Sequence, residues 1–355
     1  MKSQNKRIGY IDALRGFTMI LVVFAHVELF SLGITYDDTV IGSMFITFRM
    51  PMFFFISGFI AYKEITWDTS YYWKMLKKKS KVQIIPTLFF FILYYNICLN
   101  TSIDAFFTKG PMAYWFTIVL FYMFLLYFTI MFLCSKFNNK AWVSDIIIVL
   151  LGIIGAVTYF GGMKFYQLDK YPILCLINLS RYFEFFVLGI LCRKYHSKFY
   201  KIISNDKTKA ILLLSFFSIF ILSWKKTLIP DHSFIQIFNL EFTLRFLGLF
   251  TVFSIFFHYR GTFDNNNKSI KALRFIGRRT LDIYLIHYFF LPDLKLYFER
   301  FYNDGGLIPQ NSIIEFFIVI LLTLLVISIS LLTSAIIRSS SILGHYLLGS
   351  KLPEK

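Results

Sequence analysis

Charged residues are scarce in this sequence. Only 16% of the 355 residues are Asp, Glu, Lys or Arg, whereas 57% are hydrophobic and 20% are aromatic. A soluble domain carries about a quarter charged residues, and 45 Phe and 22 Tyr side chains cannot all be hidden in a water-soluble core. The composition excludes a pair of soluble domains and predicts a protein that lies in a lipid bilayer.

Cysteine is also rare, and its positions show no pairing pattern. The four cysteines lie singly in apolar runs with no C-x-x-C, so we expect small buried hydrophobic residues rather than disulfides. G-x-S-x-G, H-E-x-x-H and a nucleotide-binding glycine pattern are absent. The histidines have no paired-ligand spacing, so we expect no metal site.

Apolar runs long enough to cross about 30 Å of hydrocarbon recur along the whole chain. We place ten, which predicts an all-α, polytopic transmembrane helix bundle in a single domain, 1–355. The first run is too long for a signal peptide, contains Arg15 and His26 and lacks a small-residue cleavage site, so we interpret it as a span. The predicted spans are 10–33, 41–62, 82–99, 113–135, 142–160, 173–192, 210–229, 235–258, 273–292 and 312–337.

Lys and Arg are distributed unevenly between the predicted loops. With both termini in the cytoplasm, the cytoplasmic segments contain 26 of the 37 Lys and Arg residues and the outer loops contain 7. This asymmetry follows the positive-inside rule and predicts cytoplasmic termini. It accounts for most of the net charge of +17, so we expect no nucleic acid among the partners. The loops are too short for a soluble catalytic domain, and any chemistry must use groups in the bundle or on short loops.

Charged side chains inside spans are candidate functional residues, because each costs at least about 2.5 kcal/mol on insertion scales. Arg15 and His26 are eleven residues apart, close to three helical turns, which places them on one stripe about 16.5 Å apart along the axis. Arg15 can equally be an interfacial residue that snorkels, and His26 a structural histidine. Glu28 projects to another face, so we expect a carboxylate from another span, or a backbone carbonyl, to fix the tautomer of His26.

Two further pairs of buried charges have a structural explanation. Their spacings of three and four residues allow ion pairs within one helix, and self-neutralisation is the simpler interpretation. The pairs are Arg181 with Glu184 and Glu241 with Arg245.

Other polar residues lie beside helix-breaking residues or deep in late spans. Arg49 precedes Pro51, and Ser57 precedes a glycine within a run of aromatics. Proline and glycine in a span free backbone groups that must be satisfied by protein or beside a cavity. Asp282 and His287 lie five residues apart in the ninth predicted span.

Five short motifs follow one another along the chain. They are Y-I-D-A-L-R-G-F-x8-H (10–26), P-M-F-F-F-I-S-G-F (51–59), Y-W-F-T-I-V-L-F (114–121), F-E-F-F-V-L-G-I-L (183–191) and I-G-R-R-T-L-D-I-Y-L-I-H (276–287). Together they resemble the integral-membrane acyltransferase family three, bacterial enzymes that O-acylate cell-surface carbohydrates. The resemblance covers nearly the whole chain and is to the standalone form, without an extracytoplasmic hydrolase-like domain.

The resemblance implies a reaction and a set of roles. It implies transfer of an acyl group, usually acetyl, from cytoplasmic acyl-CoA to a hydroxyl of a surface or lipid-linked carbohydrate, at the bacterial cytoplasmic (inner) membrane. Acetyl-CoA is then a donor substrate, and no cofactor is tightly bound. His26 is expected to be the general base and Arg15 to assist at the donor. The further cavity residues are expected to be Arg49, Ser57, Asp282 and His287.

The chain departs from the family pattern at two places. Family members often carry His where this chain has Arg49, and usually have Arg-x-x-Arg before a proline where this chain has lysines. Lysine gives the same charge without the bidentate fork of arginine, so we expect it to bind the donor phosphates as point charges. The lysines are Lys77, Lys78, Lys79 and Lys81.

Two other functions fit the buried charges. A transporter or flippase of a sugar or lipid-linked saccharide would line its pathway with Arg, Glu and His, but it predicts repeated halves, and the first motif has no second copy. A structural membrane protein would simply pair every buried charge.

Overall fold

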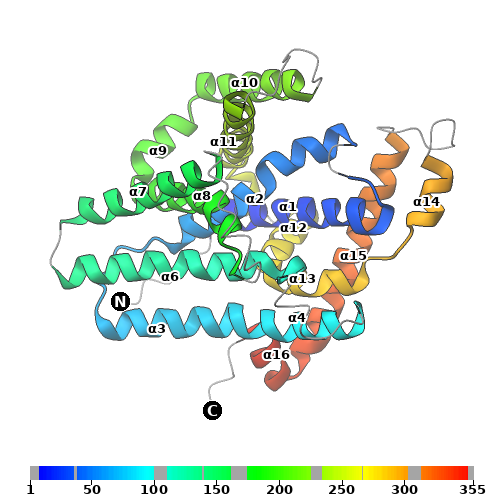
Figure 1. The fold of residues 1–355 in the computed structure, drawn as a ribbon, viewed down its shortest axis with the longest axis horizontal. Helices are drawn as coiled ribbons and strands as arrows, with labels where there is room; N and C mark the ends of the chain where they lie inside the picture. The colour runs from blue at the N-terminus through cyan, green and yellow to red at the C-terminus, as the bar shows by residue number, and fades with distance from the viewer. Residues whose placement is uncertain are drawn as a thin grey trace. The chain divides into compact units, whose positions relative to one another are not determined.

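The structure of this protein is a computed structural model, which describes residues 8–35, 38–99, 110–137, 140–160, 174–224, 234–265, 267–302 and 313–350. Within these ranges the chain is helical and contains no strand (Figure 1). Eight of the described helices are long and apolar enough to cross a membrane, which confirms the polytopic helical bundle. They are Gly9–Leu32, Val40–Ala61, Thr69–Ile97, Trp115–Lys136, Trp142–Tyr159, Asp206–Trp224, Leu240–His258 and Ile313–Ser339.

The chain forms two compact units, and each is built from two stretches of sequence. The first unit contains Met1–Phe53 and Ser197–Leu331, and the second contains Phe54–His196 and Leu332–Lys355. Helices α2 (Val40–Ala61) and α15 (Ile313–Ser339) contribute residues to both.

In the first unit, α1 (Gly9–His26) packs along α12 (Lys268–Arg278), as Figure 1 shows in blue and yellow. A Cβ added at Gly16 would collide with the backbone carbonyl of Leu273, and one added at Gly277 would collide with that of Asp12. Small residues at such interfaces let helix backbones approach closely. The remaining described helices of this unit are α9 (His196–Ile203), α10 (Asp206–Trp224), α11 (Phe234–His258), α13 (Thr280–Ile286) and α14 (Lys295–Tyr302).

Aromatic side chains fill the interior of the first unit. Phe48 of α2 packs with Phe216 and Phe220 of α10 in a cluster that also contains Leu21 and Leu244. This packing draws α1, α2, α10 and α11 around one core and accounts for part of the unusual phenylalanine content.

The second unit is built around α8 (Leu176–Lys194), which packs along α7 (Ala141–Phe160) and contacts α6 (Trp115–Lys136). A second close approach occurs here, because a Cβ at Gly58 would collide with the carbonyl of Phe186, and one at Gly189 with that of Phe55. The other described helices of this unit are α3 (Thr69–Lys79), α4 (Ile85–Ile97) and α16 (Ser341–Leu348).

Three predicted spans differ in detail from the helices observed. The span expected at 82–99 is the second half of a helix that begins at Thr69 and passes through a π-helical turn at Ser80–Ile84, so the lysine run is helical. The span expected at 173–192 is α8, which carries Arg181, Glu184, Arg193 and Lys194. The span expected at 273–292 is interrupted at Arg279, between α12 and α13, where the backbone leaves the helical conformation.

The intrahelical ion pairs and the cysteines were also predicted from sequence. Glu241 and Arg245 form the expected ion pair. Arg181 lies over the rings of Tyr159 and Tyr182, and its pairing with Glu184 stays a prediction. All four cysteines are free: Cys134, Cys175 and Cys192 are buried, as expected, whereas Cys98 is exposed.

The orientation of the helices in the membrane, with both termini cytoplasmic, stays a prediction. Most residues of the predicted outer loops at 100–112, 161–172, 225–234 and 293–311 lie outside the described residues.

Candidate active site

His26 is the last residue of α1, and a π-helical turn, Val27–Leu32, follows directly. The turn ends at Gly33, whose φ of 77° is a left-handed conformation that glycine adopts without strain. Single π-helical turns are frequent at functional sites, since the extra residue changes the direction of the side chains around it. His26 itself is half-buried.

The ring of His26 is hydrogen-bonded to the ring of His287. Nδ1 of His26 lies 2.8 Å from Nε2 of His287. His287 is fully buried and begins the 3-10 turn His287–Phe290 that follows α13. Its own Nδ1 lies 2.9 Å from the carbonyl oxygen of Ile283 and 3.0 Å from that of Tyr284. The partner expected for His26 was a carboxylate or a backbone carbonyl, and the structure provides an imidazole instead.

Tyr288 completes this cluster. Its hydroxyl oxygen lies 3.3 Å from Nε2 of His26. Its ring centroid lies 5.0 Å from that of His26 and 4.0 Å from that of His287. The two nitrogens of His26 therefore face two different groups, an imidazole at Nδ1 and a hydroxyl at Nε2.

Arg15 reaches the same late segment of the chain three turns earlier on α1. Its Nη2 donates a hydrogen bond of 2.8 Å to the Oγ1 of Thr280, the buried first residue of α13. Arg15 and His26 thus contact the two ends of α13, through Thr280 and His287. The face of α1 on which helical periodicity places both Arg15 and His26 is the face that contacts α13 and the turn after it.

Three buried charged residues, Glu28, Arg49 and Glu315, belong to the same unit as His26. Glu28 is almost fully buried, and its Oε1 accepts a hydrogen bond of 3.1 Å from Oγ1 of Thr39. Arg49 of α2 and Glu315 of α15 are buried as well, and Arg49 interacts electrostatically with both His26 and Glu28. Glu28 thus has partners other than the ring of His26, as its position on the helix predicted.

Asp282 and Ser57, which were also expected at the cavity, make other contacts. Asp282 is buried in α13, and its Oδ2 lies 3.5 Å from Nη1 of Arg279. Ser57 is a half-buried residue of the second unit, one position before the close contact between Gly58 and Phe186.

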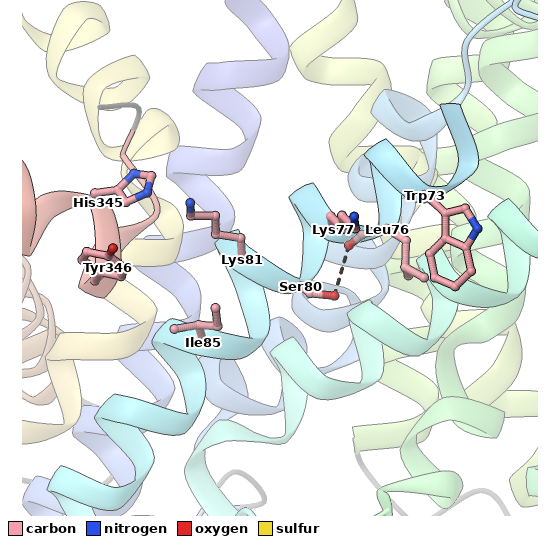
Figure 2. Close-up of a pocket in the computed structure, with 8 residues that line it drawn as sticks. All are labelled: Trp73, Leu76, Lys77, Ser80, Lys81, Ile85, His345 and Tyr346. Carbon is pink, nitrogen blue, oxygen red and sulfur yellow. Dashed lines mark hydrogen bonds between the residues drawn. The ribbon is translucent and has the colours of Figure 1, made fainter. Parts of the chain in front are cut away.

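A cavity of about 440 Å³ opens beside the lysine run, within the second unit. Figure 2 shows Trp73 and Leu76 at one end, His345 and Tyr346 of α16 at the other, and Lys77 and Lys81 between them. Both lysines are exposed. The cavity therefore offers two cations together with aromatic rings that flank them.

The other two lysines of the run, Lys78 and Lys79, do not line this cavity. The ammonium group of Lys79 lies 3.3 Å from the ring centroid of Phe124 on α6. Lys78 is exposed and close enough to Lys63 for its charge to act on that residue. Burial lowers the pKa of Lys63, and the positive charge of Lys78 lowers it further. Of the four lysines expected at the donor, two line the cavity.

Comparison with known proteins decides the family. The sequence profile of an acyltransferase domain, acyltransferase family 3, matches residues 8–332. This chain belongs to the acyltransferase 3 family. Neither the curated proteins nor the solved structures that were compared with it gave a match. It is a membrane protein, since an acyltransferase 3 domain coincides with multiple long apolar helices.

The motifs that resemble the acyltransferase 3 family meet in pairs. The first motif, 10–26, contacts the fifth, 276–287, through Gly16 and Gly277, through Arg15 and Thr280, and through the two histidines. The second motif, 51–59, contacts the fourth, 183–191, through its glycine and the opposite backbone. In each pair a glycine lets the helices approach, which fixes the register of the polar residues on them.

Sequence reasoning missed several residues of this acyltransferase 3 protein. Thr280 and Tyr288 were overlooked because Thr and Tyr are common at helix ends and in apolar runs. Glu315 had a visible signal, as a lone carboxylate at the start of the long apolar run that forms α15. The contribution of His345 to the cavity had none, because it depends on the position of α16 beside α3 and α4.

Proposed function

We propose that this protein transfers an acyl group, which we take to be acetyl, from cytoplasmic acyl-coenzyme A to a hydroxyl of a cell-surface or lipid-linked carbohydrate. We place it in the bacterial cytoplasmic membrane, with His26 as general base. Membership of the acyltransferase 3 family supports the class of reaction. The observation that carries the choice of His26 is the hydroxyl oxygen of Tyr288 lying 3.3 Å from its Nε2. An acceptor hydroxyl needs the same approach to give up its proton.

In the proposed reaction, Nε2 of His26 takes the proton of the acceptor hydroxyl while the hydroxyl oxygen attacks the thioester carbonyl carbon. A C–O bond forms and the C–S bond breaks. The proton passes from His26 to the departing sulfur, which leaves as the thiol of coenzyme A. The products are the acylated carbohydrate and free coenzyme A, and the imidazole of His26 returns to its neutral form.

The donor needs cationic partners because its phosphates are negatively charged. Lys77 and Lys81 supply two cations beside the exposed indole of Trp73 in the cavity of the second unit, and ammonium groups bind phosphates as point charges. The guanidinium of Arg15, held by Thr280, is proposed to neutralise part of the donor.

The experiment is mass spectrometry of the surface glycans of cells with and without this protein. We expect one acyl mass per repeat to disappear when the protein is absent and to return with the wild type. His26→Gln keeps a hydrogen-bonding group but cannot take up the proton, so it should not restore acylation. General-base assistance is worth about 10²–10⁴-fold in rate.

The matched control is His196→Gln, an exposed histidine at the start of α9. It should restore acylation fully at the same expression level. If His26→Gln also restored acylation at close to the wild-type level, His26 would not be the base. Unchanged glycans in cells without the protein would reject the carbohydrate as acceptor.

A further inference from the structure

The hydrogen bonds of His287 determine which of its nitrogens carries a proton. Its Nδ1 lies 2.9 and 3.0 Å from the carbonyl oxygens of Ile283 and Tyr284, in the last turn of α13. A carbonyl oxygen can only accept a hydrogen bond, so Nδ1 of His287 must be the protonated nitrogen. In a neutral imidazole the other nitrogen, Nε2, then carries a lone pair and can only accept.

The lone pair of His287 in turn selects the tautomer of His26. Nε2 of His287 lies 2.8 Å from Nδ1 of His26, and for neutral rings this contact is a hydrogen bond only if His26 donates. His26 is then protonated on Nδ1 and unprotonated on Nε2. The opposite tautomer would bring two lone pairs face to face at 2.8 Å, which is repulsive.

The relative orientation of the rings supports this bond. Their planes are within 10° of parallel, and their centroids are 5.1 Å apart although two of their nitrogens are only 2.8 Å apart. The rings therefore meet edge to edge, nearly in one plane, rather than face to face. In-plane contact directs the N–H of His26 along the lone pair of His287, which is the favoured geometry for a hydrogen bond.

We propose that His287 is a positioning residue that holds His26 in the Nδ1-protonated tautomer, so that Nε2 is the nitrogen that takes the proton of the acceptor. This inference rests on the proposed function. The carbonyls of α13 orient His287, His287 orients His26, and Nε2 of His26 faces the hydroxyl of Tyr288 at 3.3 Å. The same bond stabilises His26 when its ring is charged during the transfer, because Nδ1–H keeps its acceptor.

The size of the effect follows from histidine chemistry in general. The two ring nitrogens are distinct, and the hydrogen bond made by one decides whether the other can act as a base. In serine proteases a substitution that leaves the catalytic histidine in the wrong tautomer lowers kcat by about 10⁴. We expect a fall of at least about 10² in kcat when the acceptor at position 287 is removed.

Two variants of His287 test the proposal. His287→Gln places an amide oxygen where Nε2 was, so it keeps an acceptor for His26 but cannot titrate. His287→Leu fills similar space without an acceptor. In His287→Leu we expect kcat to fall at least about 10²-fold with an unchanged KM for acetyl-CoA, whereas His287→Gln should stay within about tenfold of the wild type.

The tautomer itself is measured by ¹⁵N NMR of histidine-labelled protein in lipid bilayers. The His26 signals are assigned as those lost in His26→Gln. We expect them to report Nδ1–H and unprotonated Nε2 in the wild type and in His287→Gln, and to change in His287→Leu. If His287→Leu does not fold, the wild-type spectrum and His287→Gln still decide the question.

The outcomes separate this inference from the proposed function. A wild-type His26 protonated on Nε2, or a His26 tautomer unchanged in His287→Leu, would overturn the inference whatever the activity. Activity that persists in His26→Gln would overturn the general-base assignment even if the NMR result is as expected.

Discussion

Gly16 of α1 and Gly277 of α12 lie where two helix backbones touch. A Cβ at Gly16 would lie 3.1 Å from the backbone nitrogen of Gly277, and one at Gly277 would lie 3.0 Å from that of Gly16. Even closer are the carbonyls of Leu273 and Asp12, which such Cβ atoms would strike. The contact places Arg15, next to Gly16, within reach of Thr280, three residues beyond Gly277. Two glycines thus set the register in which the polar residues of the two motifs meet.

This contact makes Gly16→Ala and Gly277→Ala destabilising. The obstructing atoms belong to the backbone, so a helix must shift, and overpacking of this kind costs about 1–3 kcal/mol. We expect a lower Tm and a lower yield of monodisperse protein in detergent. Gly261→Ala is the matched control, because no atom lies within 4 Å of its Cβ position and its φ is −65°. Equal Tm values for all three variants would mean that the backbones do not meet as described.

Arg15 gives a prediction about donor binding. Arg15→Ala removes both charge and fork, and should abolish acyl transfer in protein that is still inserted and folded. Arg15→Lys keeps the charge but not the planar fork, so it should retain only part of the activity. Thr280→Val removes the hydroxyl that accepts from Arg15 at nearly constant volume, and should raise the KM for acetyl-CoA more than it lowers kcat. Full activity in Arg15→Ala would refute the assignment.

Lys77 and Lys81 give a prediction with a salt dependence. Replacing both by Ala should raise the KM for acetyl-CoA severalfold, because each exposed ion pair between a lysine and a donor phosphate contributes up to about 1 kcal/mol. The KM of the wild type should rise with ionic strength, and the double variant should show a shallower rise, since salt screens exposed charges.

The control for this pair is Lys198→Ala with Lys201→Ala. Both are exposed lysines three residues apart on α9, in a segment predicted to be cytoplasmic, so the change in charge is the same. The control should leave the KM unchanged. If the two double variants have an identical KM, Lys77 and Lys81 do not bind the donor and only help to orient the protein in the membrane.

The predicted topology is tested by labelling introduced cysteines from outside the cell, in a background without the native four. Cysteines replacing Asp104 and Asp304 should be modified by an impermeant reagent. Those replacing Lys78 and Asp206 should react only after the membrane is permeabilised, since 26 of the 37 basic residues lie in segments assigned to the cytoplasm. The reverse labelling pattern would show that the topology is inverted, and the proposal of a cytoplasmic acyl-CoA donor would then be wrong.

Local properties of the sequence were enough to predict the membrane class and the shared face of Arg15 and His26. Hydropathy is a sum over neighbouring residues, so the long apolar helices are visible without tertiary information. The spacing of Arg15 and His26 places them on one face because helical periodicity depends only on the backbone. The same reasoning predicted that Glu28 does not orient His26, and Glu28 accepts a hydrogen bond from Thr39 whereas His26 contacts His287 and Tyr288.

Tertiary structure alone decided the partners of these side chains. The histidine that is hydrogen-bonded to His26 lies 261 positions later in the chain. Nothing in either segment specifies that the partner is a histidine rather than a carboxylate. The position of the Lys79 ammonium group over the ring of Phe124 likewise depends on a neighbouring helix. Pairing between distant segments is set by close packing, here at glycines that permit backbone contact. A single sequence therefore predicts candidate residues for the chemistry, and only the fold shows which of them meet.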